Sequence, residues 1–453
     1  MKKQIICIVL LCVFLCSSLN VTGLSIKQED RSLEICTDNF DMVIIAPENY
    51  RSNLDSLINH KNSVAVYTFF KSTEDIYNNF QGRDEPEKIK YFIKDAIEIY
   101  NISYVLLVGS IDLVPIRFSY YYEVITDLYY ADIYFKGTTN FCSWDKDNDD
   151  KFGEIDDWYD MDFYPDVCIG RLACTSNSEV SIVVDKIINY ETKTYGSSWF
   201  NNMILMGGNT LPSTESLYNE GEGVCEHIIK LIDDFTLIKI YASDNLFNPR
   251  NINRIVSDGA GFLVYSGHGV PNGIITYSSK ATDYYPWYMK SYMDKNIKNL
   301  NNGYKLPIMY FEACLTAKLD WEGKGSKSEP KTVFRSIFHK ISFFHRLSFS
   351  NNLFSSESDS DYEPCFAWKM VSHAGGGAIA TIGATRIMLA DSNIGGNEIT
   401  FKFFKAYEEN ITLGDMMKKA QISYINKDPM IMSYTIQEII LLGDPSLKIG
   451  GYS

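Results

Sequence analysis

The sequence predicts an α/β fold in which two subdomains carry mostly parallel sheets flanked by helices. Short apolar runs alternate with amphipathic stretches over residues 41–118, and a second alternation of this kind begins at Asn202. Two later apolar runs, at 261–270 and 306–316, are bounded by Gly or Pro, as is typical of buried strands. Alternating strands and helices imply parallel pairing through right-handed crossovers. The chain of 453 residues is long enough for two such subdomains.

The first subdomain is expected over residues 36–196. Strands are predicted at 42–46, 64–70 and 104–109, and helices at 49–60 and 85–100. A tyrosine-rich, acidic stretch follows at 120–166, and a long helix at 180–190 closes this subdomain.

The second subdomain is expected over residues 197–450. Strands are predicted at 203–208, 237–242, 261–270, 306–316 and 377–385 and near Ile440, and helices at 215–234, 249–256, 397–407 and 413–425. Residues 318–362 do not fit a compact sheet and are predicted to be an insertion or loop. The basic stretch 331–347 within it has an apolar helical face, which is compatible with contact with a membrane surface. A helix that packs on its own domain is the simpler interpretation.

The amino-terminal residues indicate export from the cell. Met1–Gly23 combines a basic start, the apolar run Ile5–Cys16 and small residues at its end, which are the features of a secretory signal peptide. We therefore expect a secreted or cell-surface protein. Of the ten cysteines, three lie in this segment and seven remain, and an odd number in an exported protein predicts at least one free thiol. A net charge of −15 argues against binding to nucleic acid, which needs a basic face.

A histidine and a cysteine mark the ends of the two apolar runs named first. His268 ends the run at 261–270, and Cys314 lies near the end of the run at 306–316. If the two strands are neighbours in a parallel sheet, an imidazole and a thiol emerge together at its carboxyl edge, where open α/β sheets hold their active sites. A histidine about fifty residues upstream of a nucleophilic cysteine is also the caspase arrangement. Cys314 is thus the natural candidate for the free thiol.

The two residue types predict cysteine peptidase chemistry. A neighbouring imidazole supports the thiolate that attacks the substrate carbonyl, and it can then donate a proton to the leaving amine of the acyl-enzyme step. The tetrahedral oxyanion needs two donors, for which the backbone N–H groups of Gly269 and Cys314 are the candidates. The expected partners are protein or peptide substrates. Two alternatives stay open, namely a transpeptidase that uses the same acyl-enzyme and a non-catalytic surface or adhesion protein.

Several motifs in order along the chain resemble those of one known family. In the second subdomain they are YSGHG, YFEAC, PCFAW, GAIATIGAT and LLGDPSL, and in the first they are YVLLVGSIDLVP, TDLYYAD and VCIGRLAC. Together they resemble the gingipain family of secreted cysteine peptidases, from about Asp41 to the end of the chain. The resemblance implies a caspase-like fold with two α/β subdomains.

The resemblance also assigns roles to individual residues. His268 and Cys314 match the catalytic pair, and Gly269 matches an oxyanion donor. Where the family has a third catalytic residue, a Glu, this chain has Asn209, which could orient the His268 imidazole but supplies no charge, so the expected catalytic unit is a dyad. The acid that lines the S1 pocket of arginine-specific members is matched by Glu222 or by Glu220, which implies a preference for a basic P1 residue, although an acid at a helix start is also favoured by the helix dipole. The residue that covers that pocket is matched by Leu389 or a neighbour.

An acidic stretch at 145–156, DKDNDDKFGEID, indicates a structural Ca²⁺ site. The expected ligands follow the spacing of an EF-hand loop: Asp145, Asp147 and Asp149, the backbone carbonyl of Lys151, and Asp156. Asp150 stands where that loop prefers Gly, and a solvated acidic loop is the alternative. No cofactor is expected for catalysis, since the sequence has neither a phosphate-binding loop of the Walker type nor a Cys/His cluster with zinc spacing.

Overall fold

The computed structural model of the chain describes residues 39–212, 219–281, 286–321, 363–389 and 395–453. Residues Asn39–Ser453 form one compact unit. The predicted signal peptide at 1–23, the basic stretch at 331–347 and most of the predicted insertion at 318–362 lie outside the described residues. Within the described ranges, no helix combines the length and the apolar character that crossing a membrane requires.

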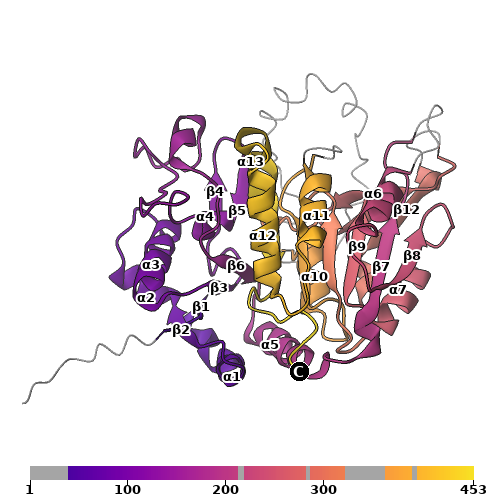
Figure 1. Ribbon diagram of the computed structural model, residues 1–453, viewed down its shortest axis with the longest axis horizontal. Helices are drawn as coiled ribbons and strands as arrows, with labels where there is room; N and C mark the ends of the chain where they lie inside the picture. The colour runs from indigo at the N-terminus through magenta and orange to yellow at the C-terminus, as the bar shows by residue number, and fades with distance from the viewer. Residues whose placement is uncertain (1–38, 213–218, 282–285, 322–362, 390–394) are drawn as a thin grey trace, which may run out of the picture. The chain divides into compact units, whose positions relative to one another are not determined.

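The centre of this unit is one sheet of ten strands (Figure 1). From one edge to the other the strands are β2 (Thr68–Ser72), β1 (Met42–Ala46), β3 (Tyr104–Val108), β6 (Cys168–Leu172), β15 (Ile439–Leu442), β14 (Ala380–Ala384), β13 (Ile308–Glu312), β9 (Phe262–Ser266), β7 (Asn202–Gly207) and β8 (Thr236–Tyr241). Neighbouring strands are parallel except β14 and β15, which are antiparallel. The sheet thus has the parallel pairing that the alternation of strands and helices predicts.

Helices cover both faces of the sheet. Tyr310 of β13 packs on Phe403 of α11 (Gly396–Lys405) with ring centroids 5.1 Å apart, whereas the next residue, Phe311, packs on Phe366 of α10 (Phe366–Ser372) at 5.3 Å. Successive side chains of a strand point to opposite faces, so α11 and α10 lie on opposite faces. Burial on both faces explains why β1, β9, β13 and β14 are buried along their whole length and read as continuous apolar runs.

The helices form two groups of neighbours. In the group that includes α11 (Gly396–Lys405), this helix contacts α12 (Leu413–Ile425) and α6 (Glu220–Ile228), and α12 contacts α13 (Pro429–Glu438). In Figure 1, α11 and α12 lie in front of the sheet. In the other group, α5 (Asn177–Lys193) contacts α1 (Arg51–Ser63) and α10 (Phe366–Ser372), and α8 (Asp294–Ile297) contacts α10 and α7 (Pro249–Asp258). Among the described residues, the other α-helices are α2 (Thr73–Asn79), α3 (Glu85–Tyr100) and α4 (Leu128–Ala131).

Smaller antiparallel sheets and an exposed edge complete the fold. One small sheet consists of β10 (His268–Val270), β11 (Gly273–Tyr277) and β12 (Met289–Met293), and the other of β4 (Arg117–Ser119) and β5 (Val124–Thr126).

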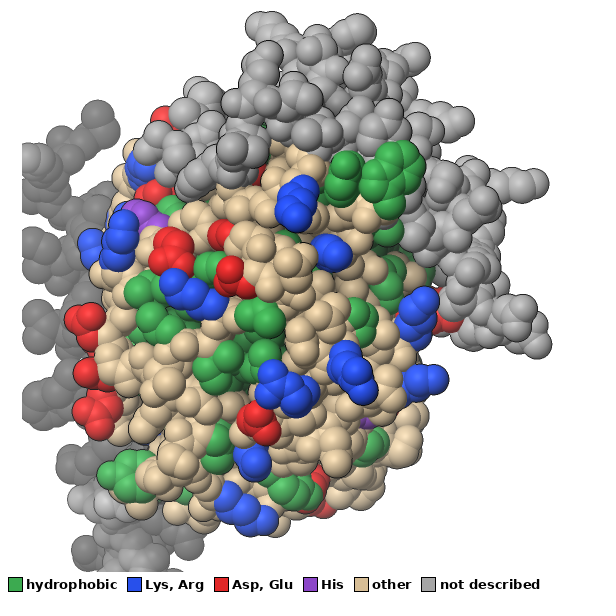
Figure 2. All heavy atoms as spheres, turned by 90° about the vertical axis from the view of Figure 1, so that its right-hand side faces the viewer, with side chains coloured by type: hydrophobic (Ala, Val, Ile, Leu, Met, Phe, Trp, Pro, Cys, Tyr) green, Lys and Arg blue, Asp and Glu red, His purple; other side chains and the backbone are tan. Residues whose placement is uncertain are grey.

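Strand β8 is an edge of the large sheet and carries the exposed Lys239, which forms an ion pair with Glu226. A lysine on an edge strand discourages pairing with another chain. Figure 2 shows the face on this side of the molecule, where basic, acidic and hydrophobic side chains are interspersed.

The predicted α/β class is confirmed, and several elements have the predicted bounds. Strand β1 and helices α3 and α12 match residue for residue. Both helices begin at side-chain caps, because Asp84 accepts from the N–H of Glu87 and Thr412 accepts from that of Asp415.

Other elements differ from the prediction. The two predicted subdomains share one sheet, which is joined where β6 pairs with β15. Residues 261–270 form two strands, β9 and β10, and strand β2 begins only at Thr68 because Ala65 turns the chain with a φ of 61°. Helices α10 and α13 and strand β6 were not predicted. The helix predicted at 215–234 is seen as α6, which ends at Ile228, short of the predicted end; residues 213–218 lie outside the described ranges.

Candidate active site

The two predicted site residues leave neighbouring strands at the same level. Strands β9 and β13 are parallel, and their last residues, Ser266 and Glu312, are paired in register. His268 and Cys314 each stand two residues beyond this pair. The sequence prediction that the two strands are neighbours is therefore confirmed, and both residues lie at the carboxyl edge of the sheet.

The backbone between these two residues is tightly packed. A Cβ atom added to Gly269 would lie 2.1 Å from the carbonyl oxygen of Cys314, so only glycine fits there. The hydroxyl of the buried Tyr265 lies 3.0 Å from the carbonyl oxygen of His268 and 2.6 Å from that of Ile275. Leu315, directly after Cys314, has a φ of 57°, and its N–H donates to the carbonyl of Arg386 at 2.9 Å. These contacts hold the segments that carry the imidazole and the thiol.

The Cys314 thiol is half-buried and lies against a backbone carbonyl. It donates a hydrogen bond to the carbonyl oxygen of Met388 at 3.7 Å. Burial raises the pKa of Cys314 to about 12, and the negative charge of the buried Glu438 acts in the same direction. Leu389, the predicted pocket wall, follows Met388 and is also half-buried, so the structure places it one residue from a contact of the nucleophile.

The His268 ring is half-buried and held by a backbone carbonyl. Its Nε2 lies 2.8 Å from the carbonyl oxygen of Thr210. Since a carbonyl only accepts, Nε2 carries the hydrogen and Nδ1 keeps the lone pair. Burial lowers the pKa of His268, which also favours the neutral ring. Among the contacts of the described residues, none joins this ring to the Cys314 thiol, and burial favours the neutral form of both groups.

Asn209 does not have the predicted role toward His268. Its side-chain oxygen accepts from the N–H of Leu211 at 2.9 Å, and its backbone is bridged to that of Tyr277. The side chain is therefore used to shape its own turn, and the contact with His268 comes from the backbone of the next residue, Thr210. A backbone carbonyl has no residue signature, so motif matching could not have identified it.

The predicted S1 acid, Glu222, lies on α6 and is half-buried. Its carboxylate accepts from the N–H of Ser243 at 3.0 Å, from the hydroxyl of Ser243 at 2.9 Å and from the side-chain amide of Asn219 at 3.1 Å. Burial raises the pKa of Glu222. A carboxylate can accept about four hydrogen bonds, and this one accepts three from the described residues.

The acidic stretch brings together three of the predicted calcium ligands. Carboxylate oxygens of Asp145, Asp147 and Asp149 lie within 4.8 Å of one another. Asp150, at the position where the loop prefers Gly, takes up the left-handed conformation with a φ of 70°. The Nζ of Lys151 is paired with the Asp149 carboxylate, so a cation at this site would share Asp149 with an ammonium group.

Asp156 is not part of this cluster. It is exposed at the start of the short helix Ile155–Asp160, whereas the following residue, Asp157, is fully buried. The Asp157 carboxylate accepts from the N–H of Lys146 at 2.6 Å and from that of Glu154 at 3.2 Å. Asp156 therefore does not join the carboxylates of Asp145, Asp147 and Asp149, because the turn at Glu154 directs Asp157 rather than Asp156 toward the loop.

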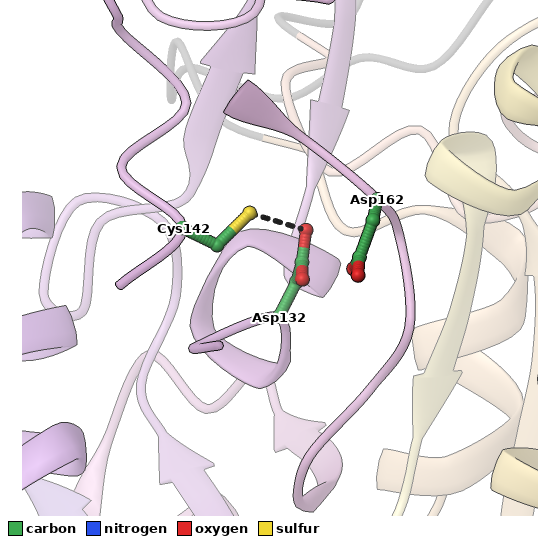
Figure 3. Close-up of side chains that lie close together, drawn as sticks. All are labelled: Asp132, Cys142 and Asp162. Carbon is green, nitrogen blue, oxygen red and sulfur yellow. Dashed lines mark hydrogen bonds between the residues drawn. The ribbon is translucent and has the colours of Figure 1, made fainter. Parts of the chain in front are cut away.

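A second cluster, not predicted from the sequence, is shown in Figure 3. Asp132, Cys142 and Asp162 offer ligand atoms within 4.8 Å of one another, and the Cys142 thiol donates to Asp132 at 3.4 Å. The buried Asp132 also accepts from the indole N–H of Trp144 at 2.7 Å. The Nζ of the buried Lys90 lies 5.6 Å from the ring centroid of the same Trp144. Ligands from separate loops have no fixed spacing, so no sequence pattern indicated this cluster.

The described cysteines are all free thiols. Five of them are buried, namely Cys142, Cys168, Cys174, Cys225 and Cys365, and Cys314 alone among the described cysteines is partly exposed. This difference in exposure supports Cys314 as the reactive thiol.

Comparisons with known proteins agree with the site. A thiol and an imidazole at the carboxyl edge of an α/β sheet are the arrangement that a cysteine peptidase requires. Residues 36–450 match the sequence model of Peptidase family C25, and the chain belongs to this family. The resemblance to gingipains is thereby confirmed.

Two curated relatives come from Porphyromonas gingivalis. Gingipain R2 is 24% identical over 285 residues, which is 61% of this chain and 32% of that protein. Gingipain R1 is 24% identical over 284 residues, which is 61% of this chain and 24% of that protein. The match therefore spans less than a third of the length of either relative.

Two solved structures share the fold. The complex of the pro- and mature domains of RgpB from Porphyromonas gingivalis has a TM-score of 0.62 and 18% identity, covering 90% of this chain and 79% of that chain. The Arg specific cysteine proteinase gingipain R has a TM-score of 0.61 and 20% identity, covering 91% of this chain and 78% of that chain. These structures confirm the predicted caspase-like α/β fold.

Proposed function

We propose that this chain is a secreted endopeptidase that cleaves peptide bonds through an acyl-enzyme on Cys314, with His268 as general acid and base. The observation that carries the proposal is the register of Ser266 with Glu312, which brings the two reactive residues to one level of the sheet edge. Family membership supports the same reaction.

Burial favours the neutral forms of the Cys314 thiol and the His268 imidazole, and we expect the scissile peptide bond of the substrate to bind between these two groups. The Cys314 thiol gives its proton to Nδ1 of His268 as the sulfur attacks the scissile carbonyl carbon. The backbone N–H groups of Gly269 and Cys314 stabilise the oxyanion of the tetrahedral intermediate. The imidazolium then returns the proton to the leaving amine, and water hydrolyses the remaining thioester. Hydrogen bonds that are long in a free enzyme commonly tighten only with substrate bound.

A preference for a basic P1 side chain is the finer part of the proposal. One solved structure of this fold is described as an Arg specific proteinase. In this chain the Glu222 carboxylate accepts three hydrogen bonds from the described residues, and its charge would attract a guanidinium or ammonium group. Leu389, beside Met388, would form an apolar wall for the stem of such a side chain.

A structural Ca²⁺ at Asp145, Asp147 and Asp149 is a further part of the proposal. The three carboxylates supply the hard oxygen ligands that this ion prefers, and their mutual repulsion is relieved when a cation binds. The ion would hold the loop and would take no part in the chemistry. Secretion through the segment Met1–Gly23 completes the proposal.

Covalent labelling by a peptidyl electrophile tests the proposed function. We expect a peptidyl chloromethyl ketone with arginine at P1 to label the wild type at Cys314, and labelling to be lost in Cys314→Ala. Cys225→Ala serves as the control, since it removes a buried thiol of the same domain. Cleavage of a peptide library then reports the P1 preference, and an added amine acceptor distinguishes hydrolysis from transpeptidation. Equal labelling of Cys314→Ala and wild type would overturn the assignment of the nucleophile.

A further inference from the structure

Glu220, the first residue of α6, reaches back to the turn that precedes this helix. Its Oε2 accepts from the N–H of Thr210 at 3.0 Å, from the hydroxyl of Thr210 at 3.1 Å and from the N–H of Leu211 at 3.3 Å. Three donors from two consecutive residues thus converge on one carboxylate oxygen. Hydrogen bonds to a charged acceptor are the stronger kind, so this carboxylate fixes the orientation of the Thr210 peptide unit.

The residue held in this way is the one that binds the His268 ring. The Thr210 carbonyl oxygen is 2.8 Å from Nε2 of His268. This contact sets the tautomer, because it places the hydrogen on Nε2 and leaves Nδ1 able to accept a proton. Glu220 therefore acts on the imidazole through one intervening residue.

Glu220 also acts on His268 through its charge. In the described part of the chain, the ring contacts the Thr210 carbonyl and lies edge-on to Tyr277 of β11, with ring centroids 6.1 Å apart. The charge of Glu220 raises the pKa of the ring, as does the hydrogen bond to Thr210, whereas burial lowers it. A negative charge at this place stabilises the imidazolium that forms during the reaction.

We propose that Glu220 is a positioning residue for His268, which it serves by holding the Thr210 carbonyl and by balancing the positive charge of the protonated ring. Glu220 on α6 thus takes the role of orienting the His268 imidazole, which the sequence had indicated for Asn209. The inference deepens the proposed function and rests on it for its effect on catalysis, whereas its effect on the ring can be measured without any activity.

Glu220→Gln separates the two contributions. The amide oxygen can still accept the three hydrogen bonds, but the charge is lost. We expect the variant to melt like the wild type, the pKa of His268 to fall in an NMR titration, and the acid limb of the kcat/KM profile to move to lower pH. A shift of about one pKa unit corresponds to about a tenfold change in equilibrium. Glu220→Ala also frees the Thr210 turn, and a displaced catalytic group costs about 100-fold in kcat.

Glu226→Gln is the matched control on the same helix. Glu226 is partly exposed and bonded to Lys239 and Tyr241, away from the ring. We expect Glu226→Gln to change neither the His268 titration nor kcat. The NMR resonance of His268 is assigned by its loss in His268→Ala, since the chain has six histidines. An unchanged His268 titration in Glu220→Gln, in an active enzyme, would overturn the positioning role and leave the proposed function intact. A shifted titration in a protein without peptidase activity would overturn the proposed function and leave the positioning role intact.

Discussion

Ser266 and Glu312 close the two strands that carry the site, and the Ser266 hydroxyl donates a hydrogen bond to the Glu312 carboxylate. Both side chains are buried, and each lies two residues before a reactive residue. Burial raises the pKa of Glu312 to about 7. The protonation of this carboxyl group, and with it the contact between the two strand ends, therefore depends on pH near neutrality.

The first prediction concerns this carboxyl group and stability. In the unfolded chain it releases its proton near pH 4.5, and in the folded protein only near pH 7. Between these values the unfolded state binds fewer protons, so the free energy of unfolding falls as pH rises, by up to about 1.4 kcal/mol per pH unit. Glu312→Gln removes this dependence.

Urea unfolding of both proteins at pH 5 and pH 8 measures the effect. Relative to wild type, the variant should gain about 2.5 kcal/mol between the two pH values. The difference between the proteins is the measured quantity, so any constant cost of the amide cancels. Parallel pH dependences would contradict a raised pKa for Glu312.

A second prediction concerns the reactivity of Cys314 in the free enzyme. Burial raises the pKa of its thiol and lowers that of His268, which favours the neutral form of both groups. Alkylation by iodoacetamide should therefore be slow at pH 7 and should rise continuously above pH 8. Mass spectrometry of the modified peptide follows this reaction, with Cys314→Ala as the blank. A plateau of fast alkylation below pH 6 would indicate a thiolate–imidazolium pair instead.

The comparison of sequence and structure shows which features a residue pattern can predict. His268 and Cys314 were found because apolar strands and their ends are visible as residue types, and parallel neighbours bring such ends together. Helices α3 and α12 were placed correctly because their caps are specific side chains.

Features that depend on backbone contacts or distant pairing were not predictable in this way. Strands β6 and β15 join the halves of the sheet through the pairing of Arg171 with Leu442, and no local pattern specifies a partner so far along the chain. The Thr210 carbonyl that binds His268 belongs to the backbone and could be supplied by any residue type. Asp156 and Asp157 are identical in type, so only the turn decides which one faces the loop.

The third prediction concerns the calcium site. Ca²⁺ should raise the melting temperature of the wild type relative to the same protein in EGTA, since a ligand at about 100 times its Kd stabilises a protein by about 2.7 kcal/mol. Asp147→Asn and Asp149→Asn should lose most of this rise, because each removes a charged oxygen ligand. Asp156→Asn is the matched control and should retain it, because Asp156 is exposed outside the cluster. A full rise in Asp149→Asn would place the ion elsewhere.

The last prediction concerns the contact between Gly269 and Cys314. In Gly269→Ala the added methyl group would meet the Cys314 carbonyl oxygen at 2.1 Å, so one of the two segments must move. Overpacking of this kind costs about 1–3 kcal/mol, and the displacement also moves an oxyanion donor away from the nucleophile. We therefore expect a lower melting temperature together with a loss of kcat of about 100-fold or more.

Gly303→Ala is the control, because its Cβ would meet no atom within 4 Å and its φ of 56° adds only backbone strain. It should lower the melting temperature slightly and leave kcat unchanged. If Gly269→Ala kept full kcat at a reduced melting temperature, the packing of Gly269 on Cys314 would support the fold alone and the oxyanion donor would have to be sought on another segment.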